Sequence, residues 1–146
     1  MILQDWAKAQ WIRPYTTTRK QIAAQFETVD RDLEDAQMGV SADWQFNIAY
    51  NASLQLCSIL LNAAGWRPEK NLAHYRTLQS LPLILGNDWQ DDADYLDICR
   101  SKRNKTEYEA IGQVTRAEAK ELADFAAKLR EEVRAWLKNN HPDFLP

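Results

Sequence analysis

Apolar residues recur along this chain at the three- and four-residue spacing of helices that bury one face. The stripe is clearest over 115–138, where it consists of Leu122, Phe125, Ala126, Leu129, Val133, Trp136 and Leu137. A second stripe runs through 19–38, at Ile22, Phe26, Val29 and Leu33. The segment 41–64 is apolar around more of its circumference, which is typical of a helix at the centre of a bundle. No stretch alternates β-branched and polar residues, so the pattern predicts no strand.

Glycines, prolines and capping residues set the expected ends of these helices. Each glycine follows a periodic segment, as glycines just past a helix do: Gly39, Gly65, Gly86 and Gly112. Thr115 and Glu118 have the spacing of a capping box. One of Thr16, Thr17 and Thr18 is expected to cap the helix 19–38. Ser41 or Asp43 is expected to cap the helix 41–64. Pro82 is expected to kink or shorten the helix around it. The predicted helices lie near 3–12, 19–38, 41–64, 71–85, 88–110 and 115–138.

Short connections between long helices favour antiparallel neighbours. We therefore expect a single all-α domain over 1–146, an up-and-down bundle of four main helices with a short extra helix at the start. A chain of 146 residues can bury a sizeable core without metals or crosslinks.

Composition and net charge limit the classes of function that the protein can have. Hydrophobic residues make up 45% and charged residues 27%, the balance of an ordinary soluble globular protein. The net charge of −3 disfavours a generic nucleic-acid binder but leaves a local basic patch open. Cys57 and Cys99 lie in apolar helical segments and are expected to be buried thiols rather than a disulfide. The start lacks a signal-peptide pattern, and 54–64 is too short and too polar to span a bilayer, so we expect a cytoplasmic protein.

Familiar metal and cofactor motifs are missing from the sequence. An acidic run could supply oxygen ligands to Mg²⁺ or Ca²⁺, and it consists of Asp88, Asp91, Asp92, Asp94 and Asp97. We favour a structural interpretation, in which Asp88 caps a helix and the other acids complement its dipole. His74 and His141 are far apart, and no spacing matches a zinc site. Without a phosphate-binding glycine loop, a nucleophile elbow or a dinucleotide fingerprint, we expect no metal and no cofactor.

The candidate chemistry gathers in the segment Arg100-Ser-Lys-Arg-Asn-Lys-Thr-Glu-Tyr108. Arg103 offers a planar fork of donors that suits phosphate, and Arg100, Asn104 and Tyr108 share one helix face. Arginine and aromatic rings are the groups that proteins use on RNA phosphates and unstacked bases. Two interpretations stay open here: a solvated helix face, with Arg103 paired to Glu107, or a phosphate-recognition site. His74 is likewise either a solvated or hydrogen-bonded side chain, or a catalytic or phosphate-binding one.

The order of features from about 41 to 137 resembles the HEPN superfamily, small all-α bundles of prokaryotic defence and toxin–antitoxin systems. The segment 48–53, with the apolar helix that follows it and Gly65-Trp66-Arg67, looks like the central helix of that family. The segment 74–78 looks like the one that follows, and 103–108 looks like the family signature. The likeness is greatest to small HEPN proteins partnered with minimal nucleotidyltransferases.

The resemblance implies a site and a dimer. In active HEPN ribonucleases four to six residues, often beginning with a polar one such as asparagine, separate an arginine from a histidine; the arginine, polar and histidine positions fall on Arg103, Asn104 and Tyr108. The tyrosine departs from the pattern, because a group of pKa about 10 cannot act as a general base at neutral pH as histidine can. The family also implies a homodimer with a shared cleft. The expected ligand-binding residues of that cleft are Arg100, Lys102, Lys105 and His74.

Two functions remain open at this point. One is a metal-independent ribonuclease toxin of a toxin–antitoxin system, with Arg103, Asn104 and Tyr108 as its catalytic residues. The other is a non-catalytic HEPN module that binds RNA, a nucleotide or a partner protein through the same cleft. In either case a nucleotidyltransferase-type antitoxin is an expected partner.

Overall fold

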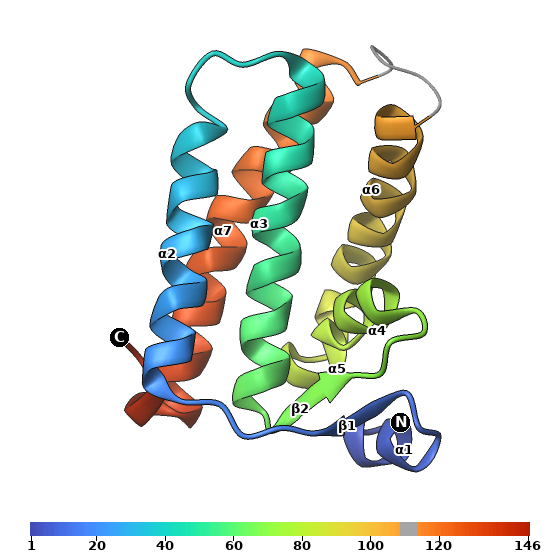
Figure 1. Ribbon diagram of the computed structural model, residues 1–146, viewed down its shortest axis with the longest axis vertical. Helices are drawn as coiled ribbons and strands as arrows, with labels where there is room; N and C mark the ends of the chain where they lie inside the picture. The colour runs from blue at the N-terminus through green and yellow to red at the C-terminus, as the bar shows by residue number, and fades with distance from the viewer. Residues whose placement is uncertain (109–113) are drawn as a thin grey trace.

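The computed structural model describes residues 1–108 and 114–146, with side chains for 1–104 and 114–146. This part of the chain is mostly helical, which confirms the all-α class (Figure 1). The helices are α1 (Leu3–Lys8), α2 (Arg19–Asp35), α3 (Ala42–Ala63), α4 (Ala73–Gln79), α5 (Leu81–Leu85), α6 (Gln90–Tyr108) and α7 (Arg116–Asn140). Two short 3₁₀ turns, Asn87–Trp89 and Pro142–Phe144, precede α6 and follow α7. No helix in these ranges is both long and apolar enough to cross a membrane.

The prediction of no strand is wrong at one place. β1 (Ile12–Pro14) pairs antiparallel with β2 (Trp66–Pro68), with Arg13 opposite Arg67. Each strand is three residues long and ends in proline, so neither is long enough to display the alternation that marks a strand in sequence. The pairing ends the first helix at Lys8 rather than near residue 12, and it joins α1 to the end of α3 (Figure 1).

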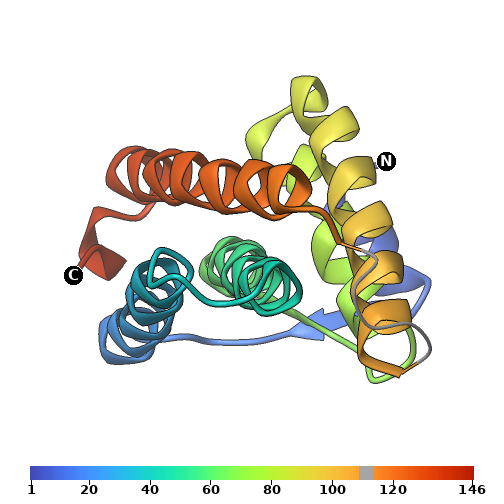
Figure 2. The same cartoon turned by 90° about the horizontal axis from the view of Figure 1, so that it is seen from above.

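The central helix of the molecule is α3, as its broad apolar surface predicts. It packs between α2 and α7 and also contacts α4, α5 and α6. Seen from above, α7 lies along one side of the α2–α3 pair, while α4 and α6 close another side (Figure 2). Residues such as Leu56, Leu60, Leu122 and Leu129 are fully buried between these helices. Cys57 and Cys99 are buried and free.

The caps predicted for 19–38, 41–64 and 115–138 are confirmed. The Thr18 hydroxyl accepts a hydrogen bond from the Gln21 amide at 3.2 Å, and Ser41 rather than Asp43 caps α3. At α7, Thr115 and Glu118 form the reciprocal capping box. These bonds satisfy backbone donors that the first turn of a helix leaves unpaired.

The expected helix ends are mostly confirmed too. Gly39, Gly65 and Gly86 have φ of 72°, 100° and 117°, the left-handed region that glycine enters without strain; Gly112 lies outside the described residues. Pro82 occupies the first turn of α5, so the predicted helix 71–85 is divided into α4 and α5. Asp88 lies within a 3₁₀ turn instead of capping a helix, because α6 begins two residues later.

Glu118 makes the stability of the protein depend on pH. A hydrogen bond from the Lys102 ammonium, followed by one from the Thr115 amide, lowers the pKa of its carboxyl from 4.5 to about 2. Because the folded pKa lies below the unfolded one, this contribution is present above the unfolded value and is lost as pH falls through about 2. We expect the free energy of unfolding to fall more steeply between about pH 5 and pH 2.5 for wild type than for Glu118→Gln. Urea titrations across that pH range measure the free energy of unfolding. Parallel plots of this free energy against pH for the two proteins would contradict the prediction.

Candidate functional site

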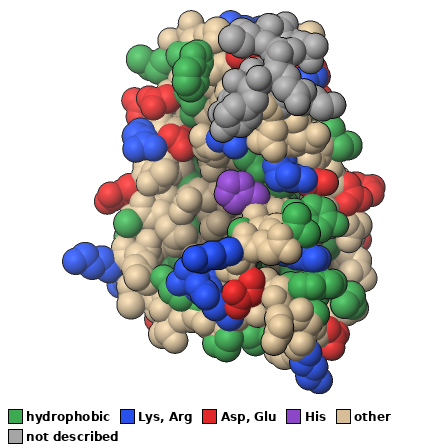
Figure 3. Space-filling model, turned by 45° about the vertical axis from the view of Figure 1, so that its right-hand side comes forward, with side chains coloured by type: hydrophobic (Ala, Val, Ile, Leu, Met, Phe, Trp, Pro, Cys, Tyr) green, Lys and Arg blue, Asp and Glu red, His purple; other side chains and the backbone are tan. Residues whose placement is uncertain are grey.

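Charged and polar side chains from three helices meet where α6 faces α3 and α4. The Arg103 guanidinium carbon lies 5.3 Å from the centre of the Tyr50 ring. The charges of Arg103 and Arg100 act on both Tyr50 of α3 and His74 of α4. We call Tyr50, His74, Arg100 and Arg103 the basic cluster. The face of the molecule that carries α4 and α6 has a histidine side chain with lysine and arginine side chains around it (Figure 3).

The floor of the basic cluster is a buried phenol. Tyr50 is 0% exposed, and its hydroxyl has no hydrogen-bond partner among the described residues. Burial raises its pKa well above the ordinary value for tyrosine, while Arg103 and Arg100 oppose that rise, so the group stays a neutral O–H donor. The Oδ1 atom of Asn47, almost one turn earlier on α3, is also buried without a described partner. Buried polar groups of this kind cost about 1–3 kcal/mol each, so their presence suggests a role in binding.

The surroundings of His74 favour its neutral form. Its ring reaches the surface, yet the surrounding protein removes part of its hydration, and this desolvation lowers the pKa of the imidazole. The positive charges of Arg103 and Arg100 lower it further. A neutral imidazole at pH 7 can accept a hydrogen bond or a proton.

The two arginines differ in their surroundings. Arg100 donates a hydrogen bond from Nε to Asp97 at 2.8 Å, and its side chain is partly buried. Arg103 is also partly buried, against the face of the Tyr50 ring. Neither side chain is a freely solvated one, so the interpretation of this segment as a simple exposed helix face does not hold for these two residues.

The structure does not bring Lys102 into the basic cluster, contrary to the sequence-based expectation. Lys102 is directed towards α7, where it forms an ion pair with Glu118. It lines a small pocket of about 70 Å³ together with Phe46 and Tyr95. The physical reason is helix geometry: residues 100 and 103 are three apart and share a face of α6, whereas residue 102 lies about 100° round the helix from residue 103.

The remaining predicted site residues are placed only in part. Asn104 is exposed, in the turn that follows Arg103. Lys105 and Tyr108 belong to α6, but their side chains lie outside the described residues, as does the expected pairing of Arg103 with Glu107. In the described ranges, which include the acidic run, no group of three His, Cys, Asp or Glu side chains is placed to hold a metal ion.

Sequence reasoning missed Tyr50 and Asn47 as members of a site. The available signal was their spacing: two polar residues three apart on the most apolar helix of the chain share a face that ought to be buried. That spacing indicates only that polar groups are buried. It does not show that arginines lie beside them, because these arginines belong to α6, which is distant in the sequence.

The chain was compared with known families, curated proteins and solved structures. No family model, no curated protein and no solved structure matches the chain. The evidence for the candidate site is its geometry: two arginines of α6 act on the surface histidine of α4 and on the buried phenol of α3.

Proposed function

We propose that the basic cluster binds a phosphate group of RNA, in a HEPN-like up-and-down bundle of the toxin–antitoxin type. The observation that carries this proposal is that Arg103 lies against the ring of Tyr50, whose buried hydroxyl has no described partner, while Arg103 and Arg100 both act electrostatically on Tyr50 and on His74. A guanidinium donates two parallel hydrogen bonds to a phosphate, and the neutral phenol of Tyr50 donates another where binding displaces the groups that cover it. Two arginines and one carboxylate, Asp97, act at this site on a protein whose net charge is −3, so attraction of an anion is local rather than general.

A second candidate function is metal-independent cleavage of the bound RNA. It is favoured by the neutral imidazole of His74, which can accept the proton of a ribose 2′-hydroxyl as its oxygen attacks phosphorus. The same proton then passes to the 5′-oxygen as the P–O5′ bond breaks, which leaves a 2′,3′-cyclic phosphate. Arg103 stabilises the charge that develops on the phosphate oxygens, and Asn104 and Tyr108 contribute polar contacts.

The alternative is a non-catalytic module that binds RNA, a nucleotide or a partner protein at the same place. Incubation of purified protein with single-stranded RNA in the presence of EDTA distinguishes RNA cleavage from non-catalytic binding. Cyclic-phosphate products that disappear with His74→Asn support cleavage, whereas intact bound RNA supports the binding module.

Two assembly proposals accompany this function. One is a homodimer in which the α6 helices of two copies flank a shared cleft and double the charges of Arg100, Arg103 and Lys105. Support comes from the resemblance and from Ile98 of α6, an apolar side chain that is 67% exposed. The other is a nucleotidyltransferase-type antitoxin partner, which is supported by the resemblance alone.

Binding of RNA is expected to strengthen as pH falls through the titration of His74. The positive charges of Arg100 and Arg103 disfavour protonation of the His74 imidazole, and a bound phosphodiester offsets those charges. The pKa of His74 therefore rises when RNA binds, and binding is accompanied by uptake of a proton. We expect affinity to increase about three- to tenfold between about pH 8 and pH 5.5. Fluorescence anisotropy of a labelled single-stranded RNA measures it. The control is His74→Asn, which keeps polar contacts but does not titrate there. A flat wild-type profile, or an unchanged slope in the variant, would refute the role of His74.

A further inference from the structure

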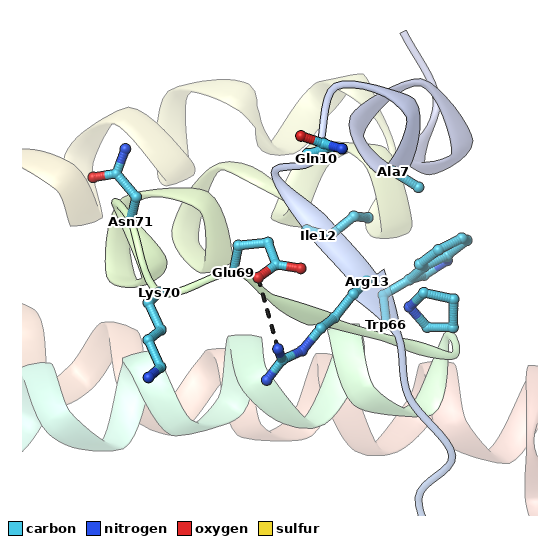
Figure 4. Close-up of a pocket in the computed structure, with 9 residues that line it drawn as sticks. Ala7, Gln10, Ile12, Arg13, Trp66, Glu69, Lys70 and Asn71 are labelled. Carbon is cyan, nitrogen blue, oxygen red and sulfur yellow. Dashed lines mark ion pairs between the residues drawn. The ribbon is translucent and has the colours of Figure 1, made fainter.

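A second pocket, of about 700 Å³, opens beside the two-stranded sheet. Its walls come from the chain around β1 and from the segment that leads from β2 towards α4. Trp66 lies on one side of it and Lys70 and Asn71 on the other, with the ion pair of Arg13 and Glu69 between them (Figure 4).

The N-terminal part of the pocket is anchored to the bundle. Trp6 and Ile12 are buried, and the rings of Trp6 and Trp11 meet edge to face with centroids 5.8 Å apart. The guanidinium of Arg76, on α4, lies 3.6 Å from the centre of the Trp11 ring. Together with the pairing of β1 and β2, these contacts hold the two walls in a defined position, so the pocket is preformed.

Backbone strain marks the same place. Among the described residues other than glycine, positive φ occurs at Gln10, with φ 61°, and at Leu72, with φ 55°. Gln10 lines the pocket, and Leu72 directly follows Asn71, which also lines it. Such residues persist where the surrounding structure requires them, and they gather at ligand-binding sites.

The chemistry of the lining matches one nucleotide. The Trp66 indole is a surface on which a base can stack, and the amides of Gln10 and Asn71 can pair with the polar edge of that base. Arg13 and Lys70 supply two positive charges against one negative charge from Glu69, so an anionic ligand is favoured over a cationic one. Aromatic stacking with flanking cations is the pattern of sites that bind single strands.

Chain connectivity places this pocket beside the basic cluster. Asn71 and His74 are three residues apart, so their Cα atoms are at most about 11 Å from each other. We propose that the pocket is a base-binding subsite for a nucleotide two or more positions along the strand from the phosphate at the basic cluster. The protein then holds single-stranded RNA over several nucleotides, more than a dinucleotide provides. This inference rests on the proposed function, since it takes the cluster to bind RNA phosphate.

The test compares a uridine hexanucleotide with a uridine dinucleotide, each labelled for anisotropy. Wild type should bind the hexanucleotide more tightly, because only the longer strand reaches both sites. Trp66→Ala should weaken hexanucleotide binding about tenfold and leave dinucleotide binding within about twofold. Trp66→Phe keeps an aromatic face and should stay within about threefold of wild type for both. Lys70→Ala, at an exposed position, should weaken the hexanucleotide selectively even if Trp66→Ala fails to fold.

The outcomes separate this inference from the proposed function. Loss of dinucleotide binding in Arg103→Ala, with no effect of Trp66→Ala or Lys70→Ala on the hexanucleotide, overturns the subsite and leaves the basic cluster standing. An effect of Trp66→Ala without any effect of Arg103→Ala supports the pocket and overturns the function proposed for the cluster. A hexanucleotide containing 4-thiouridine should crosslink to the peptide that includes 66–71, and crosslinks confined to other segments overturn the subsite directly.

Discussion

RNA binding is expected to weaken by about 1.5–3 kcal/mol when Arg103 is replaced by alanine, the range for hydrogen bonds that involve a charged group. Arg103 lies against the buried Tyr50 and acts electrostatically on His74, so its removal takes away donors and also eases the protonation of the imidazole. Arg103→Lys should recover only part of the affinity, because an ammonium cannot donate two parallel bonds to one phosphate. Titration of labelled RNA at constant pH and salt measures these differences.

Stability serves as the control for this substitution. Contact with the Tyr50 ring implies that Arg103→Ala lowers the free energy of unfolding by about 0.5–2 kcal/mol, the range of a cation–π interaction. Arg19→Ala, at an exposed position of α2, removes the same charge and should change neither stability nor affinity by more than about 0.5 kcal/mol. If Arg103→Ala instead costs several kcal/mol of stability while RNA affinity is unchanged, Arg103 is a structural residue and the proposed site is wrong.

Tyr50 should respond in opposite ways to two substitutions. Tyr50→Ala leaves a cavity at the centre of the molecule and is expected to cost about 3–5 kcal/mol of stability, as large aromatic deletions do. Tyr50→Phe removes only the hydroxyl, which has no described partner, so the free energy of unfolding should stay the same or rise by about 1 kcal/mol. Chemical denaturation of the three proteins measures both effects.

The hydroxyl should nevertheless matter for the ligand. If it donates to a bound phosphate, Tyr50→Phe weakens RNA binding by about 1 kcal/mol even though the protein is at least as stable. A stable Tyr50→Phe protein with wild-type affinity would exclude the phenol from the site. A Tyr50→Phe protein that loses 2 kcal/mol or more of stability would show that the hydroxyl supports the fold instead.

The long helices and their caps were predictable because they depend on neighbours within one or two turns. The stripe at Leu122, Leu129 and Val133 repeats at the period of the helix, and Thr115 meets Glu118 in a single turn. The candidate segment on α6 was predictable for the same local reason, since a run of basic residues is visible in any conformation. Its helical state follows from the apolar positions that precede it.

The strand pairing and the make-up of the candidate site depend on packing between segments that are distant in the sequence. The pairing of Ile12–Pro14 with Trp66–Pro68 joins segments whose few residues have no periodicity of their own. Which basic residues of α6 face His74 depends on how that helix is rotated against its neighbours, so Arg103 lies over Tyr50 while Lys102 pairs with Glu118. Local propensity selects a helix but leaves its rotation open. Burial of apolar surface on α3, α4 and α7 settles that rotation, and it brings the arginines, the histidine and the buried phenol together.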